Sequence, residues 1–306
     1  MTMSEIEVVV IGAGPAGLAV GLNLVRARRR VVMIDSNRPR HAVTLKSHGY
    51  VTQDGTPPLE FRRMGREEFE AYDEGTVLQA SVTDISRKGD GFVVTATERG
   101  GDTHSLEAAN VVLATGLVES FPEIPSLRQF YGTSAHSCME CDGYEYKDKR
   151  LALIGETEDV AERAILLSQW SKDVVLLTNG HDVVSDWWKD KLAERNIAVD
   201  PRVIDDIEGQ PGGLLTGIRF RDGDVLARDG VFVRPHWTPS VAFLDSLHVV
   251  RAMDGLITVD NEGRTSEHGL WAIGDITPPG PEQLLIAAGA GQRLASVINR
   301  TLLGLQ

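Results

Sequence analysis

The sequence has 306 residues, of which 42% are hydrophobic and 25% charged, as in an ordinary water-soluble chain long enough for two domains. The net charge of −13 has no basic stripe to offset it, which argues against nucleic acid as a partner. Two cysteines are too few for a structural disulfide framework, so we expect a cytoplasmic protein with catalytic cysteines. The apolar stretch 8–22 follows two acidic residues and is interrupted by glycines, which excludes a signal peptide or membrane segment.

The chain begins with a predicted strand, loop and helix. The β-branched run 7–11 predicts a buried parallel strand, and the loop 12–17 (Gly-Ala-Gly-Pro-Ala-Gly) follows at once. A helix is expected from there to about Arg28, and a second buried strand at 31–34 ends on Asp35. This order of elements is typical of a unit that binds a dinucleotide.

Each conspicuous residue of this unit has a physical role. Gly12 allows a tight turn, Gly14 lets the backbone approach a pyrophosphate, and Gly17 permits close packing of helix on strand. The start of the helix then favours the phosphates, and Asp35 lies where an acid binds a ribose hydroxyl.

A second copy of the unit begins 143 residues later, where Gly155 corresponds to Gly12 and no gap is needed over nearly thirty residues. The residues that matter for the nucleotide have changed. Gly14, Gly17 and Asp35 of the first copy are replaced by Thr157, Val160 and Thr178 in the second. The loop of the second copy also contains three acidic residues, Glu156, Glu158 and Asp159. Side chains with a Cβ block close approach and carboxylates repel phosphate. We therefore expect the second copy to keep its fold and to have lost its nucleotide site.

Further segments fit an α/β chain with parallel sheets. The expected strands are 91–97 and 103–107 (a hairpin), 110–116, 217–221, 230–233 and 269–275, and a helix is expected at about 281–303. Prolines near residues 122–125 and 235–239 indicate two crossings between domains.

Both cysteines lie in one Cys-x-x-Cys pair, Cys138 and Cys141. This spacing closes a small reversible disulfide and can lower a thiol pKa from ~8.5 into the range ~3.5–7.5. A zinc site would need two further ligands at short spacing, so no metal site is predicted. His136 precedes the pair and is a candidate for tuning the thiolate, although an ordinary hydrogen-bonded loop histidine is the favoured interpretation.

Four motifs now resemble those of the low-molecular-weight thioredoxin reductases: the loop 12–17, Ala114-Thr115-Gly116, Cys138-x-x-Cys141-Asp142-Gly143, and Gly274-Asp275. The resemblance implies two Rossmann-like dinucleotide-binding domains, the second inserted into the FAD domain. The expected boundaries are 1–117 and 245–306 for the two parts of the FAD domain, and 118–244 for the pyridine-nucleotide-like domain with the cysteine pair. It also implies a homodimer.

The resemblance further implies roles for single residues. Cys141 would be the sulfur nearer the flavin, Cys138 the sulfur that exchanges with substrate, and Asp142 the proton donor and acceptor. The residues expected to bind FAD are Gly12, Gly14, Pro15, Ala16, Asp35, His48, Thr115, Gly116, Gly274, Asp275 and Gln283.

The second unit departs from an NADPH-dependent member of this family. Glu156 and Thr157 stand where glycines are expected, and no arginine occurs from Ser171 to Ala193 to bind a 2′-phosphate. We therefore expect poor or no use of NADPH.

Three functions remain open. The leading hypothesis is an FAD-dependent dithiol–disulfide oxidoreductase that acts on a thioredoxin-like protein or a dithiol, with ferredoxin or another donor in place of NADPH. The alternative is an oxygen-using oxidase of small dithiols, similar to those that form the disulfides of gliotoxin and holomycin. The stretches that resemble those oxidases are 26–29, 39–40, 48–49 and 54–58. Asp142 favours the first, because the oxidases more often have His there. A non-enzymatic FAD redox sensor is the third.

Overall fold

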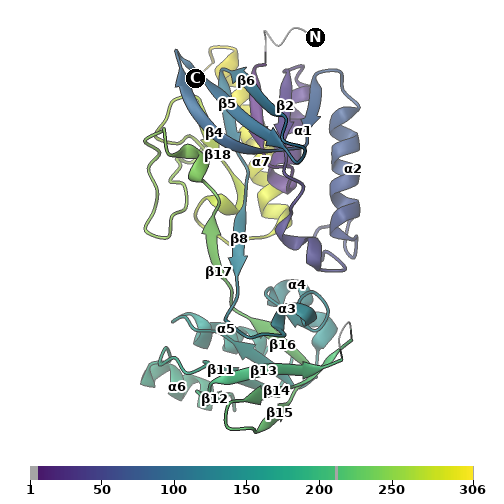
Figure 1. Cartoon of the computed structure of the whole chain (residues 1–306), viewed down its shortest axis with the longest axis vertical. Helices are drawn as coiled ribbons and strands as arrows, with labels where there is room; N and C mark the ends of the chain where they lie inside the picture. The colour runs from purple at the N-terminus through teal and green to yellow at the C-terminus, as the bar shows by residue number, and fades with distance from the viewer. Residues whose placement is uncertain (1–5, 211–212, 306) are drawn as a thin grey trace. The chain divides into compact units, whose positions relative to one another are not determined.

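The computed structural model describes residues 6–210 and 213–305, and the chain divides into two compact units (Figure 1). Unit 1 comprises Met1–Ala42, Pro58–Val118 and Thr238–Gln306. Unit 2 comprises Val43–Pro57 and Glu119–Trp237. Unit 1 is thus built from both ends of the chain, which carry the purple and yellow of Figure 1. The domain boundaries given above from the sequence stay a prediction.

The core of unit 1 is a parallel sheet with the strand order β18-β7-β1-β2-β3. Its strands are β1 (Val8–Ile11), β2 (Val31–Ile34), β3 (Gly75–Leu78), β7 (Asn110–Leu113) and β18 (Leu270–Ala272). Strands β1 and β7 are buried throughout, as expected of parallel strands that are covered on both faces. The order reverses between β1 and β7, so the loops that follow these two strands meet where α/β sheets bind ligands.

The alternation of side chains along β1 explains the two layers beside this sheet. Val8 and Val10 pack with the helices, whereas Val9 and Ile11 pack on the opposite face with a small antiparallel sheet. The helices of unit 1 are α1 (Pro15–Arg26), α2 (Pro58–Glu70) and α7 (Leu284–Leu302), with the short turns η1 (Arg40–Val43), η3 (Ala242–Leu244) and η4 (Gly274–Ile276). The antiparallel strands are β4 (Ala80–Lys88), β5 (Gly91–Glu98) and β6 (Thr103–Ala108).

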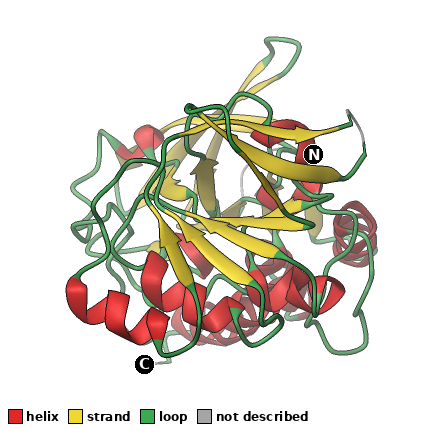
Figure 2. Ribbon diagram, turned by 90° about the horizontal axis from the view of Figure 1, so that it is seen from below, coloured by secondary structure: helices red, strands yellow, loops and turns green. Residues whose placement is uncertain are grey.

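Unit 2 repeats this plan. Its parallel sheet has the order β12-β11-β10-β16-β9. Figure 2 shows helices (red) along one side of a fan of strands (yellow). The sheet strands are β9 (Ala135–His136), β10 (Leu151–Ile154), β11 (Val174–Leu177), β12 (Ala198–Asp200) and β16 (Gly230–Val233). The helices are α3 (Leu127–Phe130), α4 (Met139–Asp142), η2 (Gly143–Tyr146), α5 (Val160–Leu167) and α6 (Asp186–Ala193). The antiparallel strands are β13 (Ile204–Gly209), β14 (Leu215–Phe220) and β15 (Val225–Ala227).

The internal duplication predicted from the sequence is visible in the strand register. The pair Val8 with Val31 in unit 1 recurs as Leu151 with Val174 in unit 2, each residue shifted by 143 positions. The chain passes from unit 1 to unit 2 within strand β8 (Leu117–Ser120) and returns within strand β17 (His236–Pro239). These two strands pair with each other. The prediction of an α/β chain with two Rossmann-like units, the second inserted into the first, is confirmed.

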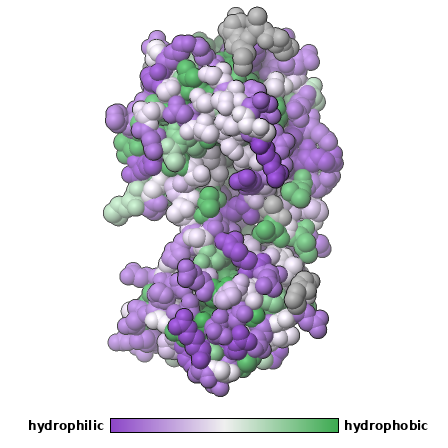
Figure 3. All heavy atoms as spheres, in the orientation of Figure 1, coloured by the Kyte–Doolittle hydropathy of each residue, from purple (hydrophilic) through white to green (hydrophobic). Residues whose placement is uncertain are grey.

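None of the helices within residues 6–210 and 213–305 is both long and apolar enough to cross a membrane. The face drawn in Figure 3 is largely hydrophilic, with apolar residues in small groups between charged ones.

Candidate active site

The redox-active pair lies at the end of a parallel strand of unit 2. Strand β9 ends at His136, and Cys138 follows as the N-cap of the short helix α4. Cys138 and Cys141 form a disulfide, and the Cys141 backbone N–H donates to Cys138 Sγ at 3.1 Å. The strand-to-helix turn thus holds both sulfurs at the carboxyl end of the sheet, where α/β folds present their reactive groups.

Asp142, the predicted proton donor, is in contact with a histidine. Its Oδ1 lies 3.3 Å from His136 Nδ1, and the two side chains are 15% and 6% exposed. The His136 ring packs between the rings of Tyr146 and Phe232, at centroid distances of 5.1 and 5.8 Å. The sequence favoured an ordinary loop histidine, whereas the structure gives a buried strand residue facing Asp142.

Tyr146 completes this cluster. Its hydroxyl donates to the Thr133 carbonyl oxygen at 2.6 Å and lies 3.3 Å from His136 Nε2. Burial, followed by the charges of Asp142 and Glu145, raises the pKa of Tyr146 to about 12. The hydroxyl is therefore protonated at neutral pH. Sequence reasoning missed Tyr146, because only the fold brings this turn residue to the ring of His136.

The backbone before the pair is held by a second polar cluster around Glu119. Tyr131 donates its hydroxyl to Glu119 Oε2 at 2.9 Å and lies 2.6 Å from Ser137 Oγ, next to Cys138. Trp237 donates its ring N–H to Glu119 Oε1 at 3.2 Å. Arg163 Nη2 donates to the Ser137 carbonyl oxygen at 3.2 Å. These contacts anchor the cysteine loop to the body of unit 2.

The first glycine-rich loop of unit 1 leaves room for a ligand. Gly12 has φ +105°, and a Cβ there would lie 2.4 Å from the Ala114 carbonyl oxygen, so only glycine fits this turn. At Gly14, the N-cap of α1, a Cβ would meet no heavy atom within 4 Å. Pro15 and Ala16 begin α1, whose first turn contains no acidic residue. The helix start is thus open to an anion.

Asp35 holds this loop in place. Its carboxylate accepts the Ala13 backbone N–H at 2.6 Å, and Arg62 and Arg66 from α2 donate to Oδ1 at 2.8 and 2.6 Å. The Asn37 backbone N–H also donates to Oδ1, at 2.7 Å. Oδ2 accepts one of these four bonds and retains capacity for a further donor, such as a ribose hydroxyl.

The corresponding loop of unit 2 is filled by its own side chains. Glu156 Oε1 accepts from the Asn179 side-chain amide at 2.7 Å, across the ends of β10 and β11. Asp159 Oδ1 accepts from the Thr157 hydroxyl at 2.6 Å, and its Oδ2 accepts from Arg234 Nε at 2.7 Å. Burial pushes the pKa of Asp159 upward, but the Thr157 bond and the Arg234 charge outweigh it and lower this pKa. An ionised carboxylate therefore lies where a phosphate would have to approach.

Comparison with known proteins agrees with this arrangement. Residues 6–291 match the model of the family described as pyridine nucleotide-disulphide oxidoreductase. The structure of a putative thioredoxin reductase TrxB from Bacillus anthracis is 36% identical, with a TM-score of 0.90 over 98% of this chain and 99% of that one. The structure of HlmI is 35% identical, with a TM-score of 0.91 over 98% and 93%. The thioredoxin reductase of Helicobacter pylori (strain J99) is 28% identical over 96% of this chain and 98% of its own length.

The chain belongs to the pyridine nucleotide-disulphide oxidoreductase family. Within it, the chain is a flavin disulfide oxidoreductase of the thioredoxin reductase-like kind, whose cofactor is FAD. The resemblance stated from four sequence motifs is thereby confirmed.

The residues of unit 1 fit the FAD of this family. The Thr115 hydroxyl, just after β7, is buried and has no hydrogen-bond partner among the described residues. Gly116 beside it has φ +62° and open space at its Cβ position. An orphaned buried hydroxyl and two open glycines around one helix start are what a bound diphosphate and ribityl chain would satisfy.

The remaining predicted residues are spread over both units. Gly274 and Asp275 follow β18, and Asp275 Oδ2 accepts from Arg40 Nη2 at 2.6 Å. Burial raises the pKa of Asp275, although Arg40 opposes this. Gln283 is the N-cap of α7. His48 belongs to unit 2, where its ring lies 3.4 Å from Asp54 and 3.6 Å from Glu145. A flavin contact of His48 stays a prediction.

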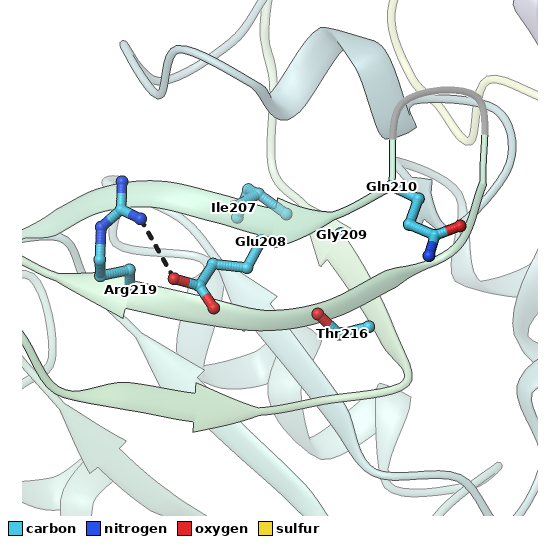
Figure 4. A pocket seen from close by; sticks show the side chains of 6 residues that line it. All are labelled: Ile207, Glu208, Gly209, Gln210, Thr216 and Arg219. Carbon is cyan, nitrogen blue, oxygen red and sulfur yellow. Dashed lines mark hydrogen bonds and ion pairs between the residues drawn. The ribbon is translucent and has the colours of Figure 1, made fainter.

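A shallow pocket on the antiparallel sheet of unit 2 carries no redox group. Figure 4 shows its lining, in which Arg219 pairs with Glu208 at 3.1 Å across β13 and β14. This pocket contains neither a thiol nor an open glycine loop, so we assign it no part in the reaction.

Proposed function

We propose that the protein exchanges electrons between FAD and a thioredoxin-like protein or dithiol through Cys138 and Cys141, with an electron donor other than NADPH. When bound, FAD supplies the two-electron chemistry that couples the disulfide to a donor or acceptor. We propose that the FAD is held by the glycine loop 12–17, by Thr115 and Gly116, and by Asp275 and Gln283.

The observation that carries the proposal on NADPH is the self-filled loop of unit 2. The Glu156 carboxylate is bonded to Asn179, and Asp159 holds the nearby guanidinium of Arg234, whose Cζ also stacks 4.5 Å from the Trp237 ring centroid. A nucleotide would have to break these contacts and bring phosphate to carboxylates. Each such loss costs about 1–3 kcal/mol, which together is several powers of ten in affinity.

The two cysteines divide the work in the proposed exchange. A substrate thiolate attacks Cys138 Sγ, the Cys138–Cys141 bond breaks, and its electron pair leaves on Cys141 Sγ. Asp142 supplies the proton that the leaving sulfur takes up and accepts the proton of the second substrate thiol. The substrate becomes a disulfide and the enzyme pair becomes reduced. The same steps in reverse reduce a substrate disulfide.

The partners follow from this proposal. We propose a thioredoxin-like protein as the substrate and ferredoxin or a similar one-electron protein as the donor. A homodimer is proposed from the family resemblance, and light scattering of the purified protein would measure it. A cytoplasmic location is proposed because both cysteines belong to one redox pair and neither staples the fold.

One observation favours the second candidate, an oxygen-using oxidase of small dithiols. Segment Val43–Pro57, which contains all but the last residue of the stretch 54–58 resembling those oxidases, groups with unit 2, the unit of the redox pair. Its His48 lies 3.6 Å from Glu145, three residues after Asp142. A small substrate needs only a pocket beside the pair, and we propose that this segment contributes one of its walls.

The experiment is anaerobic mixing of the FAD-loaded protein with dithiothreitol, for the wild type and for Cys141→Ser. The wild type is expected to lose its flavin absorbance, whereas the variant should be slower by a factor of at least about a thousand. A Cys141→Ser protein with full exchange would contradict the proposed mechanism. Oxygen is then admitted to the reduced wild type: rapid reoxidation with peroxide favours the oxidase, and slow reoxidation favours a reductase. If the protein turns over no dithiol or disulfide, the remaining hypothesis is the non-enzymatic FAD redox sensor.

A further inference from the structure

The contact between Asp142 and His136 raises the question of where a proton lies. The two side chains are largely buried, and Asp142 Oδ1 is 3.3 Å from His136 Nδ1. A carboxylate oxygen and an unprotonated ring nitrogen are both acceptors. Two acceptors that face each other in a poorly solvated site repel, so the site favours one proton between them.

Tyr146 decides which ring nitrogen of His136 carries its own proton. The hydroxyl proton of Tyr146 is used by the Thr133 carbonyl oxygen, 2.6 Å away, because a carbonyl can only accept. His136 Nε2, 3.3 Å from the same hydroxyl oxygen, must therefore be the donor in that contact. Nδ1 is left to face Asp142, and its proton is either absent or shared with the carboxylate. Nδ1 is buried and has no hydrogen-bond partner within the described part of the chain. The carboxylate of Asp142 is therefore the group positioned to share a proton with it.

The charges around the ring come from three neighbouring elements. Asp142 of α4 is the one carboxylate in contact with the ring among residues 6–210 and 213–305. Glu145 lies in η2, and its charge contributes to the raised pKa of Tyr146. Lys149 follows η2, and its Nζ is 4.6 Å from the Tyr146 ring centroid. Arg163 of α5 donates to the Ser137 carbonyl oxygen. The facing residue of β16 is the uncharged Phe232.

We propose that His136 is a positioning residue that shares one proton with Asp142 and so holds this carboxyl as the proton donor and acceptor of the exchange. The inference rests on the role of Asp142 in the proposed function. An aspartic acid in water has a pKa of about 3.9 and is almost wholly ionised at pH 7.

The shared proton balances the exchange. After a substrate thiolate attacks Cys138 Sγ, the Cys141 sulfur leaves with the electron pair of the broken bond and takes the proton of the pair. The second substrate thiol returns a proton to the pair as its sulfur attacks the mixed disulfide and releases Cys138 as a thiolate. The substrate loses two electrons, the enzyme disulfide gains two, and the His136–Asp142 pair ends as it began.

The first test compares His136→Gln with the matched control His104→Gln, whose ring pairs with Glu98 at 2.7 Å on the surface of unit 1. Flavin reduction by dithiothreitol is followed anaerobically from pH 5.5 to 9. His136→Gln should be about tenfold slower than the wild type at pH 8, and this loss should become smaller as the pH is lowered to 5.5, while the control follows the wild type at every pH. A loss of equal size at every pH, or no loss, would overturn the proposal.

The second test needs no turnover. Ring ¹⁵N–¹H correlation spectra of the oxidised, ¹⁵N-histidine-labelled protein report which nitrogen of His136 is protonated. We expect the neutral ring to carry its proton on Nε2, and Tyr146→Phe should weaken this preference. A neutral ring protonated on Nδ1 would contradict the assignment. Because these spectra do not depend on Cys141, they separate a failure of this inference from a failure of the proposed function.

Discussion

The two strand-to-helix loops that follow β1 and β10 share one backbone plan. They differ in whether they leave space for a bound phosphate. The strands beside them pair in the same register, Val8 with Val31 and Leu151 with Val174. In unit 1 the Cβ position of Gly14 is open and α1 begins without a carboxylate. In unit 2 the loop is filled by the hydrogen bonds of Glu156 and Asp159.

The comparison of the two loops shows that different residues determine the fold and the binding of a ligand. The fold depends on buried strands, and these are equally apolar in both units. Binding depends on a few positions at the strand ends, where a Cβ or a charge is enough to exclude a diphosphate. One unit can therefore lose its ligand and keep its architecture.

The largest change in ligand affinity is expected from Gly14→Thr. This variant gives the first loop the residue that the second loop has at Thr157. The protein alone has room for the side chain, so its unfolding should be unchanged. FAD would lose close backbone contact, at a cost of about 2–3 kcal/mol, or up to about a hundredfold in affinity. Fluorescence titration of the apoprotein with FAD measures this.

The control for this variant is Gly100→Thr, a hairpin position whose Cβ site is equally open. It should bind FAD as the wild type does. If Gly14→Thr also binds FAD with unchanged affinity, the open space at Gly14 is not a phosphate cradle.

A smaller effect is expected in the opposite direction, from the double variant Glu156→Gly with Thr157→Gly. Removing one carboxylate and two Cβ atoms should improve NADPH binding about tenfold, yet leave it weak, because no guanidinium cluster is added for the 2′-phosphate. The rate of flavin bleaching by NADPH measures this. Glu158→Gly removes an exposed carboxylate of the same loop, and an equal gain in that control would assign the effect to net charge alone.

The smallest effect concerns the stability of the second loop. The folded state lowers the pKa of Asp159 below its ordinary value of 3.8, so this carboxylate stabilises the fold above about pH 4 and ceases to do so as the pH falls through the lowered pKa. The side chain is 39% exposed, so Asp159→Asn should cost only about 0.5–1 kcal/mol at pH 7. Urea unfolding at pH 7 and near pH 3 should show the difference shrinking. A difference that grows on acidification would contradict the sign.

Much of the fold could be predicted because its strands are marked by buried β-branched runs. The expected strands 31–34 and 230–233 coincide with β2 and β16, and the predicted hairpin is β5 and β6. Strand β4 (Ala80–Lys88) was missed, since its half-exposed sequence has no apolar run. The grouping of Val43–Pro57 with unit 2 was also missed, because long-range contacts leave no local pattern.

The candidate site was predicted in its linear motifs and missed in its contacts. Cys138 and Cys141 could be selected from their spacing, and Asp142 from the family resemblance. The contact of His136 with Asp142 and Tyr146 depends on β9, a strand of two residues that no periodicity reveals. The pairing of Asp35 with Arg62 likewise joins two elements that only the fold brings together.

The central claim is that the nucleotide site of unit 2 is filled by its own side chains, and an anaerobic titration of the FAD-loaded protein with NADPH tests it most directly. Flavin absorbance is followed first with micromolar NADPH and then with dithiothreitol. The account predicts that NADPH leaves the flavin oxidised and that the dithiol bleaches it. Prompt bleaching by micromolar NADPH would contradict the account, because a phosphate would then bind beside Glu156 and Asp159.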